Sequence, residues 1–386
     1  MAVQGVFASD SGIVGDQKQD FESFVTKLAP SGDFPFFKLS AGMKSERAEA
    51  AIVNWFEENY VSGEVQLNGA ITTETAFVLD DSSTIVPGDI MQVVPSGEYI
   101  YVTANVTATN TITVVRGFAG TTAASIADNA KIQKITHARE ENSNRPVAIT
   151  YLGQPMYNYT QIIRSAWGIS RTAKNVAFHT GNPLAKRRQD AAWQHAVNLE
   201  RALLWGKKTW GVQNGQPFRT MDGILTQIKT NVTVAGATTT RAQFEDFLES
   251  AFKYNLEGFP NERICFLDNK ALRVLNDIAW ANSTFNMEST SKVFGMDVRS
   301  WKSPFGDISL MTHPMMNEGT NWRGHLYLIH PGSVVKKVMQ PTLVETYDKD
   351  SGTDGDSGGL TTELSVIYKG ERTGAKLTGL TAAAAS

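Results

Sequence analysis

Residues 183–208 read PLAKRRQDAAWQHAVNLERALLWGKK, and this stretch has the strongest helix pattern in the chain. Its apolar residues recur near the spacing of one helical face: Trp193, Ala196, Val197, Leu203 and Leu204. Asn182 is a candidate N-cap, and Pro183 suits the first turn. Lys207 and Lys208 stand where cations favour the carbonyl end of a helix. The pattern predicts a helix about 38 Å long, long enough to act as a spine.

Downstream of this helix, the pattern alternates between helix and strand. An amphipathic helix is expected at 241–256, a buried strand at 263–267 and a helix at 270–280, so residues 220–290 are predicted to form an α/β unit. Further strands are expected at 293–301, 308–313, 326–330, 334–339 and 362–368. Residues 348–359 are rich in Gly, Asp and Ser and are expected to form a polar loop.

Upstream of the helix, residues 61–136 have a different residue pattern. Short Val/Ile/Thr/Tyr-rich runs alternate there with turn residues, at 76–80, 89–94, 99–106, 111–116 and 131–135. This regular spacing predicts a small β-barrel or sandwich. The more polar flanks, 54–60 and 138–159, are expected to pair as one long hairpin that carries this block at its tip.

Residues 1–37 have no sustained period and are expected to form an extended arm. Phe34, Phe36 and Phe37 would be costly in a solvated tail, so we expect the arm to lie on another surface.

The composition excludes several classes of protein. The chain has 386 residues, a net charge of −3 and a single cysteine, so a disulfide-braced scaffold or a cysteine zinc cluster cannot form. A near-neutral chain is not a general nucleic-acid binder with a basic face. We expect no membrane span and no secretory signal, because no apolar run is long enough and no basic region precedes one.

One string has the form of a catalytic motif. Residues Gly355-Asp356-Ser357-Gly358-Gly359 resemble the nucleophile loop of chymotrypsin-like proteases. None of the six histidines has the sequence context of that family, and a flexible Asp/Gly/Ser surface turn explains the string more simply. We therefore expect no catalytic residue, and a serine hydrolase built on Ser357 is the alternative.

Two other groups contain the residue types of binding sites. His313, His325 and His330 cluster in the sequence, but their spacing suits strand ends better than a metal site. The basic run Lys186-Arg187-Arg188 fits a solvated helix face better than a nucleic-acid contact. No metal and no cofactor are expected.

The order of elements, from arm to hairpin, inserted block, spine helix, α/β unit and strand-rich return, resembles one known family. Matching pieces are Val86-Pro87-Gly88-Asp89, Val114-Val115-Arg116-Gly117-Phe118-Ala119-Gly120-Thr121-Thr122-Ala123, Met156-Tyr157-Asn158-Tyr159-Thr160-Gln161-Ile162, Gly223-Ile224 and the stretch from Gly355 to Leu364. The chain resembles the major capsid proteins of tailed phages with the Hong Kong 97 fold, in the SU10-like branch with an inserted domain.

The resemblance implies an α+β fold with a definite domain map. It places an N-terminal arm at 1–37, an extended hairpin at 38–60 and 137–165, and an inserted small β-barrel at 61–136. It also places a peripheral domain with the spine helix at 166–220 and 292–350, and an axial domain at 221–291 and 351–386.

The implied function is a structural one. The chain would assemble into hexamers and pentamers of an icosahedral head, which encloses double-stranded DNA without sequence-specific binding. It would be found in the virion and, during assembly, in the host cytoplasm. Scaffolding, portal and decoration or cement proteins are the implied partners, and no membrane is involved. An encapsulin-like nanocompartment shell is the alternative with the same fold.

Residues for contacts between subunits can be named on this basis. They are the arm aromatics and the hairpin charges: Phe34, Phe36, Phe37, Glu57, Glu58, Arg139, Glu140, Glu141 and Arg145. Some family members cross-link covalently through a hairpin lysine, but 54–60 and 138–159 contain no lysine, so non-covalent contacts are expected here.

Overall fold

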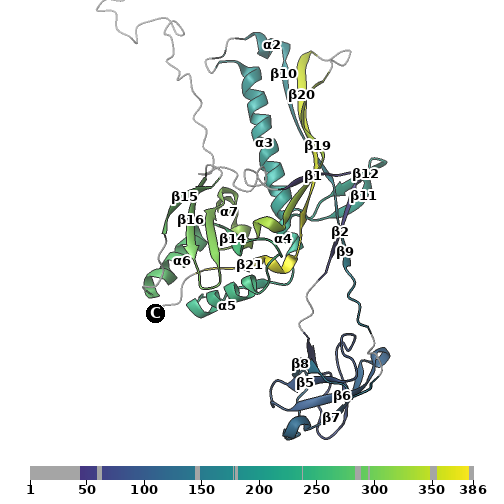
Figure 1. The fold of residues 1–386 in the computed structure, drawn as a ribbon. Coiled ribbons are helices and arrows are strands. Elements are labelled where there is room, and N and C mark those ends of the chain that lie inside the picture. Colours follow the sequence, from purple (N-terminus) through teal and green to yellow (C-terminus); the bar gives the residue numbers. More distant parts are fainter. Residues whose placement is uncertain are drawn as a thin grey trace, which may run out of the picture. The chain divides into compact units, whose positions relative to one another are not determined.

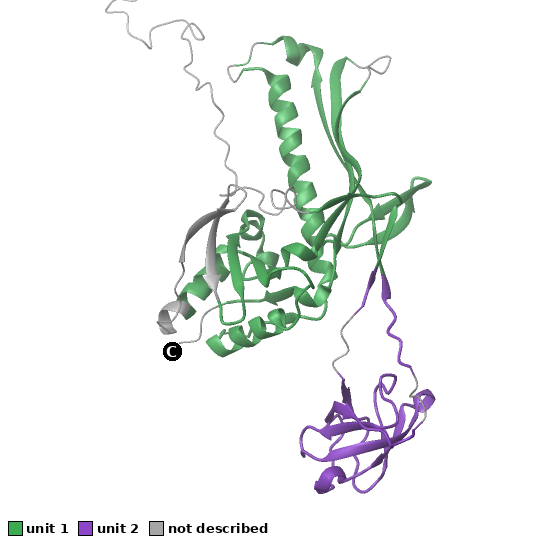
Figure 2. Ribbon diagram, viewed as in Figure 1, with its two compact units in different colours: residues 1–55, 156–386 green, residues 56–155 purple. Residues whose placement is uncertain are grey.

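The chain divides into two compact units, shown in Figure 2: unit 1 comprises residues 1–55 and 156–386, and unit 2 comprises residues 56–155. A computed structural model describes residues 44–58, 63–143, 148–176, 178, 181–236, 238–282, 288–293, 296–347 and 354–381. The predicted arm at 1–37 lies outside these described residues.

The predicted spine is helix α3 (Pro183–Trp205), about 35 Å long. The side chain of Asn182 caps it by accepting hydrogen bonds from the backbone amides of Leu184 (2.9 Å) and Ala185 (3.4 Å). The helix ends at Trp205 because Gly206 leaves the helical region. The prediction that Lys207 and Lys208 close the last turn is therefore wrong, since both follow the helix.

Helix α3 lies along a four-stranded sheet in unit 1 (Figure 1). The strand order is β1 (Ser45–Arg47), β19 (Val334–Tyr347), β20 (Gly355–Tyr368) and β10 (Gln161–Ser170). Strands β19 and β20 run well past the predicted ends at 339 and 362. The residues 355–359, expected in a polar loop, are strand because β10 and β19 pair with β20 on both sides and override its turn-like composition.

A seven-stranded sheet forms the second layer of unit 1. Its order is β13 (Val232–Val234), β21 (Ala375–Thr378), β18 (Leu326–Ile329), β14 (Glu262–Leu267), β17 (Asp307–Thr312), β16 (Met296–Lys302) and β15 (Glu288–Val293). Apolar side chains of helices α5 (Arg241–Phe252) and α6 (Asn269–Asn282) pack in one cluster with alternate residues of β14, such as Cys265 and Leu267. The predicted helices and strand at 241–280 are confirmed.

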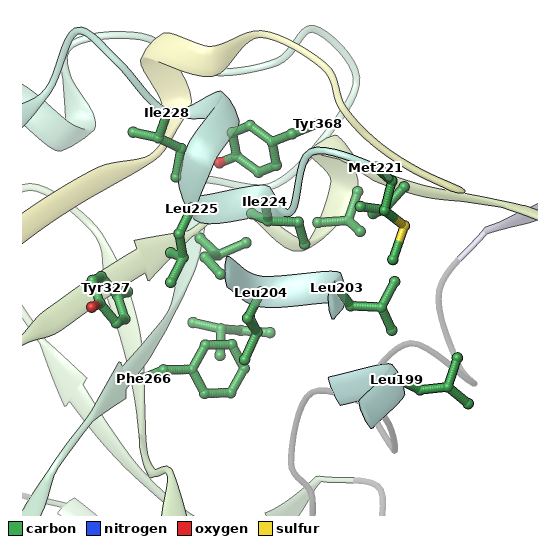
Figure 3. Close-up of a cluster of buried hydrophobic side chains, with 14 of the residues drawn as sticks. Leu199, Leu203, Leu204, Met221, Ile224, Leu225, Ile228, Phe266, Tyr327 and Tyr368 are labelled. Atoms are coloured by element: carbon green, nitrogen blue, oxygen red, sulfur yellow. The ribbon is translucent and has the colours of Figure 1, made fainter. Parts of the chain in front are cut away.

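The other face of this sheet belongs to a central cluster, which joins both sheets to α3 (Figure 3). Ile264 and Phe266 of β14 enter this cluster, so the strand is buried on both faces. The remaining labelled members come from the end of α3, from the turn and short helix α4 (Ile224–Gln227) after it, and from β18 and β20: Leu199, Leu203, Leu204, Met221, Ile224, Leu225, Ile228, Tyr327 and Tyr368.

Two glycines bring the end of α3 against the start of α4. A Cβ atom on Gly223 would lie 2.6 Å from the carbonyl oxygen of Leu204, and one on Gly206 would lie 2.7 Å from that of Met221. The amide of Gly223 donates to the carbonyl of Gly206 at 2.9 Å. Both glycines have negative φ angles, so close approach, and not backbone conformation, requires them here.

The sheets divide unit 1 differently from the predicted domain ranges. Strands β17 and β18, assigned to the peripheral range, pair with β14 of the axial range. Strand β20, assigned to the axial range, pairs with β19 of the peripheral range and with β10, which spans the predicted hairpin and peripheral ranges. The peripheral and axial boundaries stay predictions, while the pairing shows that both ranges contribute to both sheets.

Unit 2 is built on a six-stranded antiparallel sheet. Its order is β3 (Glu64–Gln66), β8 (Lys131–His137), β5 (Asp89–Val93), β6 (Tyr99–Val106), β7 (Thr111–Val115) and β4 (Ala76–Val78). The five strands expected from the sequence are present, with β3 in addition. An isolated bridge joins Leu67, after β3, to Leu79, after β4. A closed barrel stays a prediction.

The unit has its own core of buried apolar side chains, mostly aliphatic, and the ring of Phe77 is fully buried among them. The flanks of the insertion pair with each other as β2 (Ile52–Glu57) and β9 (Gln154–Tyr159), in a two-stranded sheet. Within the described part of the chain, no helix combines the length and apolar character needed to cross a membrane.

We predict that Gly223→Ala destabilises unit 1 by about 1–3 kcal/mol, because the added methyl group would meet backbone atoms that cannot rotate away. Urea unfolding followed by tryptophan fluorescence measures this, since every tryptophan of the chain lies in unit 1.

Gly168→Ala is the matched control. Gly168 lies on β10, and a Cβ atom added there would have no neighbouring atom within 4 Å. The unfolding midpoint of the Gly168→Ala variant should therefore stay close to that of the wild type. Equal midpoints for Gly223→Ala and the wild type would contradict the close-packing argument.

Candidate functional site

The protease-like string does not form a catalytic loop. Ser357 lies within β20, is exposed, and pairs through its backbone with Gly168 of β10 and Tyr347 of β19. The expectation of a surface turn is therefore wrong as well. The next residue must be glycine because a Cβ there would collide with the ring of Trp167 and the carbonyl of Glu345. Packing between strands explains the glycine, and none of the hydrogen bonds found in the described residues joins Ser357 to a histidine.

The histidines have structural surroundings. His195 of α3 is buried, with Nε2 2.7 Å from the hydroxyl of Thr362 and Nδ1 3.2 Å from that of Ser165, and burial lowers its pKa. His313 contacts Glu200 of α3 through Nε2 at 2.8 Å, with both side chains buried. These contacts tie α3 to the two sheets.

The other two histidines of the sequence cluster flank β18. Burial and the nearby Arg263 lower the pKa of His330 to about 4, and His325 contacts the hydroxyl of Tyr327 at 2.8 Å. Across the described ranges, no three His, Cys, Asp or Glu side chains are grouped in a way that could hold a metal ion.

Five of the predicted contact residues lie in the described part of unit 2. Glu58, Arg139, Glu140 and Glu141 are exposed, and Glu57 at the end of β2 is half-buried. The backbone of the segment after β8 is anchored, since the amide of Ala138 donates to the carbonyl of Gly88 at 2.9 Å. Phe34, Phe36, Phe37 and Arg145 lie outside the described residues.

The run 114–123 surrounds a buried ion pair. The guanidinium of Arg116 makes two hydrogen bonds to the carboxylate of Glu98, at 3.0 and 2.8 Å, and both side chains are buried. Arg116 also donates to the carbonyls of Thr72 (2.7 Å) and Ala124, so it ties three loops together. Its guanidinium lies 5.7 Å from the centre of the Phe77 ring.

The Glu98 carboxylate completes this arrangement. It accepts hydrogen bonds from the backbone amides of Gly117 (3.1 Å) and Ala124 (3.2 Å). Burial opposes ionisation, but the bonds from Arg116, Ala124 and Gly117 outweigh it and lower the pKa of Glu98. The run thus has a structural role, which is to fix the loop after β7.

A surface that the sequence reasoning missed lies on the hairpin of β11 (Thr209–Gln213) and β12 (Gln216–Thr220). Its turn is Asn214-Gly215, with φ angles of 52° and 74°, the residues and conformation of a tight hairpin turn. Trp210 and Val212 share one face of this hairpin and are 51% and 72% exposed. The Asn-Gly pair between two short β-prone runs was the available signal.

An aromatic row extends from this hairpin to strand β9. The rings of Trp210 and Tyr159 are 5.5 Å apart, and those of Tyr159 and Tyr157 are 5.6 Å apart. Cations lie at both ends of the row, with the Lys208 ammonium 3.9 Å from the Tyr157 ring centre and the Arg219 guanidinium 5.5 Å from that of Trp210. A partly exposed aromatic surface of this kind is typical of a protein contact surface.

The residues thus provide no constellation for chemistry within the described ranges, and they do provide exposed apolar and charged surfaces. The family model described as SU10 major capsid protein matches residues 6–381, nearly the whole chain.

The chain belongs to the SU10 major capsid protein family. A major capsid protein of Pseudomonas phage PaMx41 is 27% identical over 392 residues, covering 94% of this chain and 92% of the relative. The capsid protein of Myoviridae phage XM1 is similar in structure, with a TM-score of 0.51 at 10% identity, covering 98% of this chain and all of the other. A chain of the holo-SrpI encapsulin complex from Synechococcus elongatus PCC 7942 gives a TM-score of 0.45 at 10% identity, covering 60% of this chain and 78% of that one.

These matches confirm the family and the Hong Kong 97 type of α+β fold that the sequence predicted. The chain is a major capsid protein of a tailed phage, a structural protein. Its surfaces are therefore to be understood as candidates for contacts in a shell.

We predict that Glu98→Gln lowers the stability of unit 2 by about 3–5 kcal/mol at neutral pH, because it leaves the buried Arg116 without a carboxylate. Hydrogen exchange of the backbone amides in 114–126, in the full chain, measures this. In the wild type the folded pKa lies below the ordinary 4.5, so the stabilisation is complete above pH 4.5 and fades as the pH falls further. The variant should lack this acid-dependent loss.

Lys131→Gln is the control, because Lys131 pairs with Glu64 at 2.9 Å on the exposed surface of the same unit. It should cost less than about 1 kcal/mol. If both variants exchange like the wild type, the buried pair does not hold the loop.

Proposed function

We propose that this chain is the subunit that builds the phage head, assembling with copies of itself into hexamers and pentamers of an icosahedral shell around double-stranded DNA. The family match over residues 6–381 is the observation that carries the proposal. A shell of this kind is held by many modest contacts between identical copies, so it needs broad surfaces and no deep pocket. The protein would reside in the virion, and in the host cytoplasm while heads assemble.

The exposed surfaces of unit 1 support this role. In the isolated chain, the aromatic row exposes Trp210 and Tyr157 to solvent, and Val212 of β11 is exposed as well. In the four-stranded sheet, Val344 and Leu343 of β19 are 69% and 43% exposed. Burying such side chains against another subunit would contribute favourable free energy to assembly.

We infer that the chain is not an enzyme. The hydrolase alternative requires a base for Ser357, and the buried His195 is already held between Ser165 and Thr362. The encapsulin alternative shares the fold but calls for a smaller shell that contains protein cargo. Portal, scaffolding and decoration proteins remain proposed partners, with no cofactor and no covalent cross-link in the shell.

Negative-stain electron microscopy of the purified full chain tests this proposal. We expect phage-sized closed shells, and DNA-filled heads when the protein is isolated from infected cells. Small shells filled with protein would instead favour the encapsulin alternative. Persistent monomers that cleave a peptide substrate, with the cleavage lost in Ser357→Ala, would overturn the proposal in favour of a hydrolase.

The arm 1–37 is proposed to lie on neighbouring subunits through its aromatic residues. We predict that replacing Phe34, Phe36 and Phe37 together with Ser lowers the yield or thermal stability of shells, because each buried ring contributes apolar contact area. Sedimentation and electron microscopy measure particle yield, and the tryptophan signal of unit 1 shows whether the variant still folds. Folded subunits that form shells as stable as the wild type would refute the role of the arm.

A further inference from the structure

The chain contains two Asn-Gly pairs, and the fold holds them differently. Both pairs, Asn68-Gly69 and Asn214-Gly215, are exposed. Such a pair can react within itself, because glycine has no side chain to keep its backbone nitrogen away from the carboxamide of the preceding asparagine. The reaction requires a backbone nitrogen without a hydrogen bond and a backbone that can rotate. The fold therefore determines which pair reacts.

The first pair is fixed by hydrogen bonds. It lies in unit 2, between two isolated β-bridges. The backbone amide of Asn68 donates to the carbonyl of Val78 at 2.8 Å. The backbone amide of Gly69 donates to the carboxylate of Asp128 at 2.7 Å. The nitrogen that would have to attack is thus already bonded, and the backbone on both sides of it is anchored.

The second pair is less constrained. Asn214 and Gly215 form the two-residue turn of the hairpin, after the last paired residues Gln213 and Gln216. Among the hydrogen bonds of the described residues, none is donated by the backbone amide of Gly215. Strands β11 and β12 form a sheet of two strands only. A ribbon of this kind is marginally stable, so its tip opens transiently and its backbone can rotate.

We propose that Asn214 is a modification site, at which the side-chain carboxamide is lost by spontaneous deamidation. The backbone nitrogen of Gly215 gives up its proton and attacks Cγ of Asn214. A new bond between these two atoms closes a succinimide ring. The bond from Cγ to Nδ2 breaks, and the side-chain nitrogen takes up one proton and leaves as ammonia. Water then opens the ring at either carbonyl, which gives aspartate or isoaspartate, and it is the one co-reactant.

Either product changes the hairpin. Both products add a negative charge at its tip, and isoaspartate also lengthens the backbone, because the chain then runs through the former side chain. The turn of a two-residue hairpin sets the register of its strands. Trp210 and Val212 of β11 would therefore be presented differently after the reaction, so the exposed surface of the hairpin changes as the protein ages.

Peptide mapping of the purified full chain by mass spectrometry tests the proposal. The protein is incubated at mildly alkaline pH in heavy-oxygen water and digested in ordinary water, so that only a reaction during the incubation labels the product. We expect Asn214 to react at least about tenfold faster than Asn68, whose neighbouring amide is bonded to a carboxylate. The product should contain isoaspartate. Equal rates at the two sites, or aspartate without isoaspartate, would overturn the proposal.

The unfolded chain is the control for the effect of the fold. In urea, Asn68 and Asn214 should react at similar rates, because the hydrogen bonds that distinguish the two pairs are then lost. If the same difference in rate persisted in urea, it would come from the flanking residues, and the structural argument would fail.

Asp128→Ala provides the converse test. It removes the acceptor of the Gly69 amide, so the rate at Asn68 should rise by about tenfold. The rate at Asn214, in the other unit, should stay as in the wild type. If Asn68 in this variant reacts as slowly as in the wild type, the hydrogen bond does not protect it, and the proposal fails.

Asp81→Ala is the matched control. Asp81 is an exposed residue of the same unit, and its carboxylate accepts a hydrogen bond from the amide of Ser83 at 2.8 Å. Its removal leaves the bond to Gly69 in place, so the rate at Asn68 should not change. Hydrogen exchange of the backbone amides in unit 2 shows whether both variants fold.

Discussion

The architecture of unit 1 depends on one close approach of two backbones. The end of α3 meets the start of α4 at Gly206 and Gly223, where no side chain would fit. Because the contact leaves no room for rearrangement, it fixes the angle at which the chain leaves the spine helix. Leu203 and Leu204 on one side and Ile224 and Leu225 on the other then enter the same cluster. Both sheets pack on that cluster, so their positions follow from it.

Different interactions stabilise the two units. Unit 1 buries apolar side chains between layers, with polar links such as His313 and Glu200 inside the core. Unit 2 is smaller, and its aliphatic core is supplemented by a buried ion pair that organises loops instead of strands. A buried ion pair adds less net stability than an apolar core of the same size. The pair of Glu98 and Arg116 does, however, select one conformation for the loops that it joins.

Local patterns in the sequence predicted the elements whose own residues determine them. The helices α3, α5 and α6, the strand β14 and five strands of unit 2 follow from spacing and turn residues. The extension of β20 through Gly355–Gly359 could not be predicted, because it depends on pairing with β10, nearly two hundred residues away in the chain. Glu98 and Arg116 are only 18 residues apart, but their pairing could not be predicted because it depends on how the loops of unit 2 meet in the folded chain. The hairpin at Asn214-Gly215 had a usable signal that was overlooked, and the family was identified from an ordered set of short motifs.

The pairing of β2 with β9 has a consequence for the history of such chains. The segment between these strands begins and ends at neighbouring positions of unit 1, because β2 and β9 pair with each other. For the packing of unit 1, this segment is therefore equivalent to a hairpin turn. A gene could lose this segment, lengthen it or exchange it for another compact module without repacking the remaining core. Unit 2 is thus a place where related chains can diverge while the core of unit 1 keeps its packing.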